Sequence, residues 1–438
     1  MATESLQRNL LSQEDTQLLD DYFHRAKKAF NEIKTYSQEE VDRLIRAVAW
    51  SVANKKTFER IAKMGVEESG LGDPEGRVDK RMKIRGVLRD ALREKSVGLI
   101  KEIPETGLKI YGKPVGIIAS LIPTTNPELT PAVTAIYAIK ARDVVIFSPH
   151  PRAKKTTNEV VRIMRETLEK LGAPADILQC LPYVNKTLTH ELMARADLVM
   201  ATGGQDMVRA AYSSGTPAYG VGKGNATIII DETADVEIAA RNTRISKTKD
   251  FGSGCSADGN LVIHESIFDE MVKALQKEGG YLASNEEREL LRKVMWDDEG
   301  RRLPDTVAVS PQKLAEKAGF IIPDDRKFIM VMSDGVGKGK VFADEKLTTL
   351  LTLHKYEGEF DNAIKIVLGI FENGGMGHSC GIYSHAEERI NHLAEVLPVS
   401  RIMVRQPQSV ANAGSFTNGM PQTASMGCGT WGGNITSE

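Results

Sequence analysis

The chain has 438 residues, and 41% of them are hydrophobic, which is enough for a large buried core and for two domains, or one domain with a subdomain. The formal net charge is -2, with both signs spread along the chain, which argues against binding of nucleic acid or anionic membranes through bulk electrostatics. No segment has a membrane-spanning length, and the first residues, interrupted by Asp and Glu, do not form a secretory signal. These properties favour a cytoplasmic protein of enzyme size.

The four cysteines, Cys180, Cys255, Cys380 and Cys428, lie far apart and form no CxxC pair. This pattern suits a reducing compartment and predicts neither a disulfide framework nor a metal site. We interpret Cys180 and Cys380 as inert small hydrophobes. Cys428, within MGCGTWGG, is less clearly defined.

Helices are predicted near the N-terminus, because apolar side chains recur every three to four positions in residues 15–33 and 38–69. Ser37 and Glu40 have the spacing of a capping box at the start of the second segment.

The pattern then changes to short β-rich segments, residues 98–104 and 107–114, with a Thr-Gly turn between them. We predict a hairpin that leads into a buried strand at residues 115–122. Such a hairpin is either an arm for a neighbouring subunit or an ordinary edge hairpin.

Strands and helices alternate after this hairpin, which predicts crossover units on a parallel sheet. The first run has expected strands at 143–149, 176–182, 198–204 and 225–231, and expected helices at 156–172, 189–196 and 205–214. The second run begins with a helix near Glu237 and has expected strands at 260–264, 327–333, 381–384 and 401–406, and expected helices at 266–279, 360–374 and 387–397. The chain therefore has two predicted α/β domains, followed by an ordered, Gly-rich loop system at 414–434.

Three segments of the first run, IPTTNPELTP, SPHPRAKKTT and ATGGQDMVRA, follow predicted strands. Ligands of open α/β sheets bind outside the carboxyl ends of strands, where helix N-termini offer N–H groups to phosphates. Gly203 and Gly204 stand at such a junction, although neither GxGxxG nor a P-loop is present. A turn alone would also need glycines there.

SPHPRAKK adds His150, Arg152, Lys154 and Lys155 after a predicted strand. A Rossmann-like fold usually places an acid there for a ribose hydroxyl, whereas basic groups would accept a 2′-phosphate. The alternative interpretation is a solvated helix start.

The stretch FGSGCSADGN surrounds Cys255 with small residues and with Gly252, Gly254 and Gly259. A thiolate that attacks a carbonyl needs space for a tetrahedral centre, backbone N–H donors for the oxyanion, and a nearby cation or helix end. The small residues would provide space and amides, and Lys247 and Lys249 are close in sequence. A nucleophile and an inert cysteine are equally compatible with this composition.

The motifs PTTNP, SPHPRAKK, ATGGQDMVRAAYSSGTPAYGVGKGN, FGSGCSADGN, EKLT, GHSCGI and GCGTWGGN occur here in order. Together they resemble the CoA-acylating branch of the aldehyde dehydrogenase superfamily. That branch includes acylating sulfoacetaldehyde and succinate-semialdehyde dehydrogenases and the aldehyde dehydrogenase half of bifunctional aldehyde/alcohol dehydrogenases. The cysteine stretch is most similar to the sulfoacetaldehyde type.

The resemblance implies an aldehyde dehydrogenase-like α/β fold. Its expected parts are a Rossmann-like dinucleotide-binding domain (1–98 and 115–230), a β-hairpin oligomerisation arm (99–114), an α/β catalytic domain (231–404) and a C-terminal segment (405–438) that returns to the first domain. A homodimer or higher homo-oligomer is implied. The chain ends at Glu438, where members of the superfamily continue with a segment that helps subunits pair, so the oligomeric state stays open.

The resemblance also implies a reaction in which an aldehyde, coenzyme A and NAD or NADP give an acyl-CoA and reduced cofactor, without a metal. Cys255 matches the nucleophile, and Asn126 matches the amide that helps hold the oxyanion. Glu345 matches the acid that contacts the nicotinamide ribose. The other implied cofactor residues are Thr124, His150, Pro151, Arg152, Lys154, Gly203, Gly204 and Gly222.

Hydrolytic members carry a glutamate just before a Gly-Gly-Lys segment, as base for the attacking water, whereas PAYGVGKGN has no carboxylate. Thioester hydrolysis should then be slow, and a thiol can attack instead. Asp258 departs from the Glu that many acylating members have three residues after the cysteine.

The substrate is less defined. Five cations lie in segments that could approach the acyl site and would suit an anionic substrate tail: Arg244, Lys247, Lys249, Arg401 and Arg405. Sulfoacetaldehyde is favoured, ahead of succinate semialdehyde and short aldehydes. The rivals are a hydrolytic aldehyde dehydrogenase and a catalytically silent assembly subunit.

Overall fold

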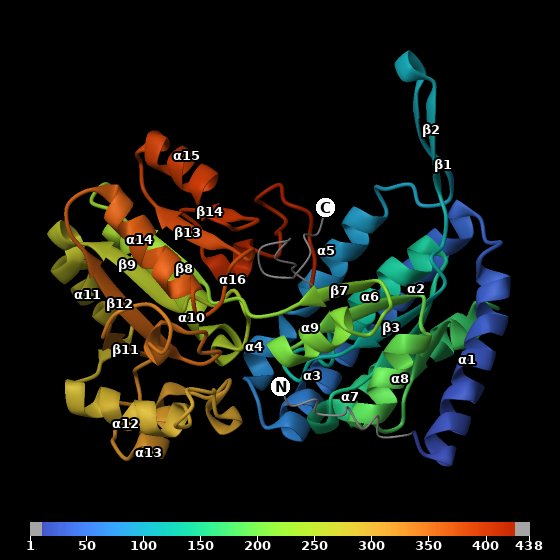
Figure 1. Ribbon diagram of the computed structural model, residues 1–438, viewed down its shortest axis with the longest axis horizontal. Helices are drawn as coiled ribbons and strands as arrows, with labels where there is room; N and C mark the ends of the chain where they lie inside the picture. The colour runs from blue at the N-terminus through green and yellow to red at the C-terminus, as the bar shows by residue number, and fades with distance from the viewer. Residues whose placement is uncertain (1–10, 425–438) are drawn as a thin grey trace, which may run out of the picture. The chain divides into compact units, whose positions relative to one another are not determined.

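The computed structural model describes residues 11–424, so Cys428 and the GCGTWGGN motif lie outside the described residues. The chain divides into two compact units, which we describe separately (Figure 1). Among the described residues, unit 1 comprises 11–69 and 80–220, and unit 2 comprises 70–79 and 221–424.

Unit 1 contains a five-stranded sheet of order β5-β4-β3-β6-β7. Its strands are β3 (Ile117–Leu121), β4 (Val144–Ser148), β5 (Leu178–Cys180), β6 (Leu198–Thr202) and β7 (Ala218–Val221). Its helices are α1 (Gln13–Ile33), α2 (Gln38–Ala53), α3 (Lys55–Ser69), α5 (Arg81–Ala91), α6 (Thr130–Ala141), α7 (Lys154–Lys170), α8 (Lys186–Arg195) and α9 (Gln205–Tyr212). Strand β3 pairs in parallel with β4 on one side and with β6 on the other. The strand order therefore reverses between β3 and β6, which is where open α/β sheets bind ligands.

The helical N-terminal region confirms one local prediction and corrects another. The Ser37 side chain accepts from the Glu40 N–H, and the Glu40 carboxylate accepts from the Ser37 N–H, so the predicted capping box is present. The single helical segment predicted for 38–69 is two helices, because Asn54 adopts an extended conformation (ψ 145°). Its side chain accepts from the Thr57 N–H and begins α3.

The predicted hairpin is present as β1 (Gly98–Ile103) and β2 (Leu108–Gly112), which pair antiparallel around a turn at Gly107, whose φ is 67°. It extends away from the rest of unit 1 (Figure 1). Apolar side chains on and beside it are exposed, including Leu108 and Tyr111, which are more than half exposed.

Unit 2 contains a seven-stranded sheet of order β10-β11-β12-β9-β8-β13-β14, and every neighbouring pair in it is parallel. Its strands are β8 (Thr227–Ile230), β9 (Asn260–His264), β10 (Gly280–Leu282), β11 (Phe328–Met332), β12 (Leu350–Tyr356), β13 (Cys380–Tyr383) and β14 (Ile402–Val404). Its helices are α4 (Pro74–Val78), α10 (Val236–Thr248), α11 (Phe268–Lys277), α12 (Asn285–Met295), α13 (Pro311–Ala318), α14 (Phe360–Phe371), α15 (Glu387–Val396) and α16 (Gln408–Ala411).

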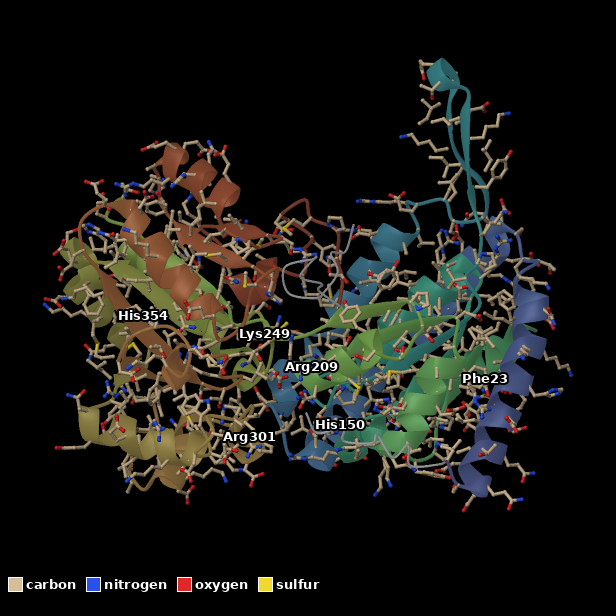
Figure 2. All side chains as sticks on the ribbon, in the orientation of Figure 1. Phe23, His150, Arg209, Lys249, Arg301 and His354 are labelled. Atoms are coloured by element: carbon tan, nitrogen blue, oxygen red, sulfur yellow. The ribbon has the colours of Figure 1, made fainter. Side chains whose placement is uncertain are left out.

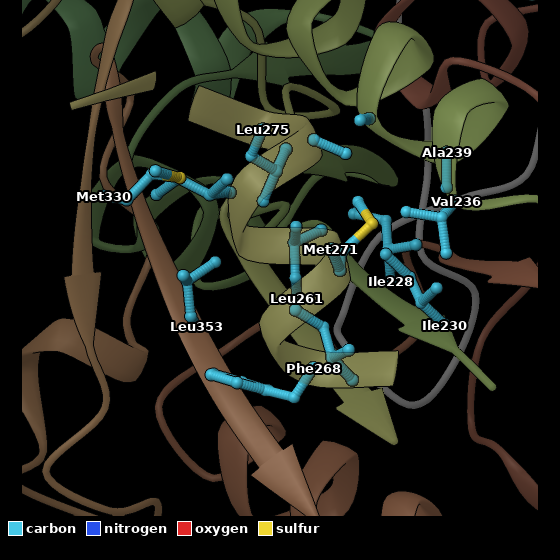
Figure 3. Close-up of a cluster of buried hydrophobic side chains, with 14 of the residues drawn as sticks. Ile228, Ile230, Val236, Ala239, Leu261, Phe268, Met271, Leu275, Met330 and Leu353 are labelled. Carbon is cyan, nitrogen blue, oxygen red and sulfur yellow. The ribbon is translucent and has the colours of Figure 1, made fainter. Parts of the chain in front are cut away.

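Both faces of this sheet are buried. Ile228 and Ile230 of β8 pack in one cluster with residues of α10 and α11 (Figure 3), whereas Ile229 between them packs with α14 and α15 on the other face. Successive side chains of a strand point to opposite faces, so a strand covered on both sides is apolar throughout. Strand β12, which was not among the predicted elements, lies inside this sheet between β11 and β9.

Within residues 11–424, no helix combines the length and the apolar character that a bilayer crossing requires. The same residues contain no cluster of three or more His, Cys, Asp or Glu side chains arranged to hold a metal ion.

Candidate active site

The carboxyl ends of three adjacent unit 1 strands carry most of the predicted cofactor residues. Thr124 follows β3, His150 follows β4 (Figure 2), and Gly203 follows β6. Because these strands are parallel neighbours, the three segments lie at one edge of the sheet. Pro151, Arg152 and Lys154 continue the segment after β4, and Gly204 continues the segment after β6.

The start of α9 is open to a ligand. Gly204 is its N-cap and gives it no side-chain hydrogen bond, and a Cβ added at Gly204 would meet nothing within 4 Å. The first N–H groups of a helix lack intrahelical partners and favour anions. Nearby in the fold, Thr124 Oγ1 is buried with no hydrogen-bond partner among the described residues. These features fit the phosphates and polar groups of a dinucleotide.

The start of α7 is different, because Glu68 covers it. The Glu68 carboxylate accepts from the N–H groups of Lys155 and Thr156, each at 2.7 Å. Arg152 donates to the Ser69 carbonyl at 2.8 Å, and burial, with a smaller effect of Arg152, lowers the pKa of His150. Arg152 of the basic run is thus engaged within unit 1, and a carboxylate lies at the start of the helix that follows the run.

Asn126 lies in the loop between β3 and α6. Its Oδ1 accepts from Lys80 Nζ at 2.8 Å, and its Nδ2 lies 3.4 Å from Thr125 Oγ1. The Asn126 carbonyl accepts from the Thr130 N–H at 3.1 Å, which anchors the loop to the first turn of α6. The amide is half-buried, so one side of it is accessible.

In unit 2, the candidate residues lie at the amino edge of the sheet, not at its carboxyl edge. Cys255 precedes β9, and His378 precedes β13. Gly224 and Glu345 precede β8 and β12. These four strands are adjacent and parallel, in the order β12-β9-β8-β13, so the four preceding loops meet at one edge.

Gly224 allows two of these loops to touch. A Cβ at this position would lie only 2.7 Å from the Cys255 Cβ, which is shorter than atoms can approach. Cys255 is half-buried. Glycine at 224 therefore permits this close approach of the two loops, which no other residue would allow without a shift.

The His378 side chain lies within hydrogen-bonding distance of the thiol. Its Nε2 lies 3.3 Å from Cys255 Sγ, and its ring is fully buried. Burial, and secondarily the positive charge of Arg401, lower the pKa of His378 to about 3. The ring is therefore neutral at pH 7 and contacts sulfur as an uncharged partner.

A buried polar cluster orients this ring. Ser379 Oγ accepts from Gln408 Nε2 at 2.8 Å and from Asn412 Nδ2 at 3.0 Å, and lies 2.8 Å from His378 Nδ1. With both amides in this orientation, the serine oxygen uses its two lone pairs, and its own hydrogen is left for Nδ1. The His378 Nε2 then carries the hydrogen and can donate it to Cys255 Sγ.

The loop that leads to Cys255 is strained and held by a buried ion pair. Asp250 and Phe251 have φ values of 48° and 50°, in the left-handed region that side chains disfavour. The Asp250 carboxylate lies 3.2 Å from the Arg77 guanidinium, and these side chains are 2% and 0% exposed. Asp250 also accepts from Ser253 Oγ at 2.6 Å, two residues before the cysteine.

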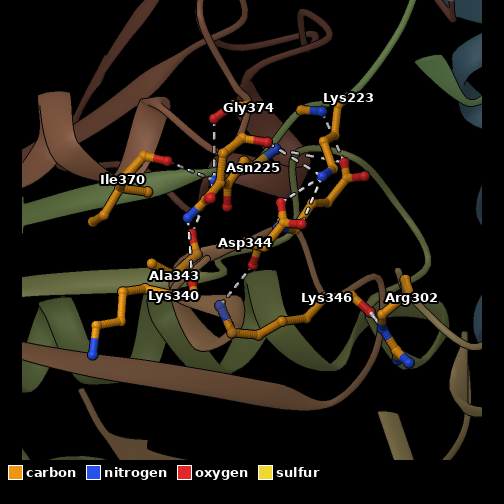
Figure 4. A network of polar contacts seen from close by, with 12 residues as sticks. Lys223, Asn225, Arg302, Lys340, Ala343, Asp344, Lys346, Ile370 and Gly374 are labelled. Atoms are coloured by element: carbon orange, nitrogen blue, oxygen red, sulfur yellow. Dashed lines mark hydrogen bonds and ion pairs between the residues drawn. The ribbon is translucent and has the colours of Figure 1, made fainter. Parts of the chain in front are cut away.

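Glu345 and Lys223 tie the EKLT segment to the glycine-rich run before β8. The Glu345 carboxylate accepts from the Gly224 N–H at 2.8 Å, and burial raises its pKa. Lys223 Nζ contacts both oxygens of Asp344, at 2.6 and 2.7 Å (Figure 4). Gly222, predicted to contact the cofactor, lies in the same run between β7 and β8.

Asp258 does not face the thiol as a free carboxylate. It is buried and accepts from Ser246 Oγ of α10, and burial raises its pKa to about 7. Of the five cations proposed for the substrate, Arg401 is close enough to act electrostatically on His378. Arg244 pairs with Glu278, and Lys247 is 1% exposed within α10, where burial lowers its pKa to about 7.

We expect stability to fall in acid because two histidines are buried neutral. Burial lowers the pKa of His354 (Figure 2) and of His378 to about 3, whereas an unfolded histidine titrates near about 6.5. Below that pH the histidine is protonated in the unfolded chain but stays neutral in the folded chain. Each histidine therefore lowers the free energy of unfolding by about 1.4 kcal/mol per pH unit, until the pH approaches about 3.

Urea denaturation of wild type and His354→Gln between pH 7 and pH 5 tests this expectation. His354→Gln should lose less stability than wild type over this range, and the exposed His385→Gln serves as the matched control. Parallel pH dependence of wild type and His354→Gln would contradict the buried neutral ring.

Sequence reasoning missed several of these residues. His378 was visible only as part of the GHSCGI motif, and Lys80, Gln408 and Asn412 carried no local signal. His378 and Cys255 share one feature: each lies in the loop before a strand.

Comparison with known proteins agrees with this geometry. Residues 9–287 match the model of the aldehyde dehydrogenase family. A sulfoacetaldehyde dehydrogenase of an Acholeplasma species is 43% identical over 423 residues, which cover 95% of this chain and 87% of the relative. An acetylating succinate-semialdehyde dehydrogenase of Clostridium kluyveri is 37% identical over 422 residues, 96% of this chain and 92% of the relative.

The fold is shared with a solved structure at nearly full length. The crystal structure of an acetylating aldehyde dehydrogenase from Geobacillus thermoglucosidasius superimposes with a TM-score of 0.93 at 35% identity, covering 97% of this chain and 94% of that one. The chain therefore belongs to the aldehyde dehydrogenase family, in its CoA-acylating branch, and is an oxidoreductase that acts on aldehydes.

Proposed function

We propose that this enzyme converts sulfoacetaldehyde, coenzyme A and NAD(P)+ into the acyl-CoA and NAD(P)H, with Cys255 as the nucleophile. The observation that carries the proposal is the half-buried Cys255 thiol with a neutral imidazole nitrogen 3.3 Å from its sulfur. This contact can supply the hydrogen bond that an attacking thiolate needs.

In the first half of the reaction, Cys255 Sγ adds to the aldehyde carbon and forms a thiohemiacetal. His378 donates a hydrogen bond from Nε2 to the sulfur, which stabilises the thiolate before attack. Asn126 Nδ2 donates to the developing oxyanion. A nicotinamide cofactor, when bound, would supply the hydride acceptor for this oxidation. Cys255 holds the acyl group as a thioester once the thiohemiacetal has been oxidised.

Within unit 1, the strand-end groups are those that would hold the cofactor. Gly222 and Glu345, in unit 2, are cofactor residues on the strength of the family resemblance. Gly203, Gly204 and the open start of α9 suit its phosphates, and Thr124 suits a polar group. Glu345 accepts from the Gly224 N–H through Oε1, and its other carboxylate oxygen would be the one to accept from a ribose hydroxyl. We leave NAD and NADP as alternatives, although Glu68 at the start of α7 favours NAD because a carboxylate repels a 2′-phosphate.

In the second half, the thiol of coenzyme A attacks the thioester, and Cys255 leaves as a thiolate. The run PAYGVGKGN lacks the carboxylate that activates water in hydrolytic members, so the thioester survives until a thiol arrives. The Cys255 leaving group is again stabilised by the His378 Nε2–H. The products are acyl-CoA, NAD(P)H and one proton, which balances the reaction.

The substrate proposal rests on two observations. One is the sulfoacetaldehyde dehydrogenase among the relatives. The other is Arg401, which precedes β14 at the same amino edge of the sheet and whose charge lowers the pKa of His378. A cation near the reacting sulfur suits an aldehyde with a sulfonate tail. Succinate semialdehyde, with a carboxylate tail, is the second candidate because a relative of comparable similarity acts on it.

We expect cofactor reduction beyond one equivalent per chain only when coenzyme A is present. The assay follows absorbance of the reduced cofactor for sulfoacetaldehyde, succinate semialdehyde and acetaldehyde, each with NAD and NADP, with and without coenzyme A. Sulfoacetaldehyde should have the highest kcat/KM. Sustained turnover without coenzyme A would instead support hydrolysis, and a higher kcat/KM for succinate semialdehyde would replace the substrate.

The hairpin β1–β2 supports a further proposal, that the enzyme is a homo-oligomer in which this arm contacts a neighbouring subunit. Its exposed Leu108, Ile110 and Tyr111 would be buried by such a contact. We also propose that the enzyme acts in the cytoplasm, because the mechanism needs Cys255 as a free thiol.

A further inference from the structure

We infer that Lys80 is a positioning residue for the reaction: its ammonium holds the Asn126 amide in the one orientation that presents Nδ2 to the oxyanion. The inference rests on the proposed role of Asn126. Both residues belong to unit 1, Lys80 as the N-cap of α5 and Asn126 in the loop after β3.

The contact with the Lys80 ammonium shows which terminal atom of the Asn126 side chain is Oδ1 and which is Nδ2. Lys80 Nζ lies 2.8 Å from one terminal atom of the Asn126 side chain and 3.2 Å from the Thr125 carbonyl oxygen. An ammonium has three hydrogens and no lone pair, so it can face only acceptors. The Asn126 atom beside it must therefore be Oδ1, and the flipped amide would place an N–H against a cation.

The opposite end of the amide is left for a ligand. Among residues 11–424, the recorded contact of Nδ2 is Thr125 Oγ1 at 3.4 Å, a weak interaction for one of its two hydrogens. Asn126 is half-buried, so part of the residue is accessible, and its second amide hydrogen has no partner in the described contacts. This is the donor that the oxyanion would use.

The rest of the loop cannot fix the amide by itself. Pro127 restricts the backbone of Asn126 to extended conformations, and the Asn126 carbonyl is bonded to the Thr130 N–H. Both constraints act on the backbone and leave rotation of the terminal amide free. The ammonium supplies the missing constraint, and by attracting electron density to Oδ1 it also makes the Nδ2 hydrogens stronger donors.

A double-mutant cycle on kcat of the full-length enzyme tests the inference. Asn126→Ala should lower kcat about 10²–10³-fold. Lys80→Met should lower kcat about 10- to 100-fold with little change in KM, because the lost constraint acts on the transition state. In the Asn126→Ala background, Lys80→Met should have no further effect, since the amide it orients is gone.

Three controls separate this role from a structural one. Lys80→Arg keeps a donor-only cation and should retain more activity than Lys80→Met. Lys95→Met removes an exposed lysine near the end of α5 and should leave kcat unchanged. Should Lys80→Met fail to fold, Lys80→Gln takes its place in the same cycle.

Equal losses from Lys80→Met with and without Asn126 would overturn the inference and leave Lys80 with a purely structural role. An Asn126→Ala variant with unchanged kcat would remove the oxyanion role of Asn126, and with it the role of Lys80. Neither result would bear on the role of Cys255 as nucleophile, which the Cys255 variants test separately. Failure of the Lys80 inference and failure of the proposed function are therefore distinguishable.

Discussion

Replacing Cys255 by alanine or serine is expected to abolish cofactor reduction, with a loss of about 10⁴-fold or more in kcat. The sulfur forms both covalent species of the mechanism, and no other group can replace it: the other described cysteines, Cys180 and Cys380, have thiols whose pKa is raised by burial. The rate is measured by absorbance with saturating aldehyde and coenzyme A.

The burst experiment makes this test sharper. Wild type without coenzyme A should reduce at most one cofactor per chain and should gain the mass of one acyl group, whereas Cys255→Ala should do neither. Cys180→Ala, in unit 1, is the matched control and should keep full activity. A Cys255→Ala variant with only a small loss of rate would contradict the role of Cys255 as nucleophile and would place the reaction at another residue.

Arg77→Met is expected to lower the free energy of unfolding by about 3–5 kcal/mol, the usual cost of leaving one partner of a buried ion pair uncompensated. The Asp250 carboxylate would remain 2% exposed and charged, bonded to the Asp73 N–H at 2.8 Å and to Ser253 Oγ at 2.6 Å. These bonds hold the strained turn before Cys255, so activity should fall as well. Urea denaturation and the standard assay measure the two effects.

The double variant Arg77→Met/Asp250→Asn distinguishes the lost charge balance from lost packing. Asparagine has the shape of aspartate, tolerates the left-handed φ of 48° at this position and carries no charge. It should therefore recover a large part of the stability lost in Arg77→Met. A loss below about 1 kcal/mol in Arg77→Met would show that the pair is no stronger than a surface salt bridge.

Local sequence signals predicted the elements whose causes are local. The Ser37–Glu40 capping box, the hairpin around Gly107 and the apolar strand that became β3 depend on residues within a few positions of one another. The break between α2 and α3 was missed, because Asn54 ends one helix and caps the next inside a continuous apolar pattern. Strand β12 was missed although it is buried at nearly every position.

Which edge of each sheet carries the candidate residues was harder to predict than the strands themselves. The three unit 1 segments follow β3, β4 and β6, as the strand pattern predicted, and their cofactor role stays a prediction. The rule that ligands bind at the carboxyl edge does not describe unit 2, where Cys255, His378 and Glu345 precede their strands. Which edge carries the chemistry depends on the lengths and close contacts of loops, such as Gly224 against Cys255, and these are tertiary properties.

The sequence by itself determined the family and the α/β class and identified Cys255 as a candidate nucleophile, because long ordered motifs are properties of the chain. Only the tertiary structure decided what surrounds that cysteine. His378 is 123 positions away and meets the thiol because β9 and β13 flank β8 in one parallel sheet. Arg77 and Lys80 are likewise identified by partners 173 and 46 positions away, and no local pattern records a contact between residues so distant in the chain.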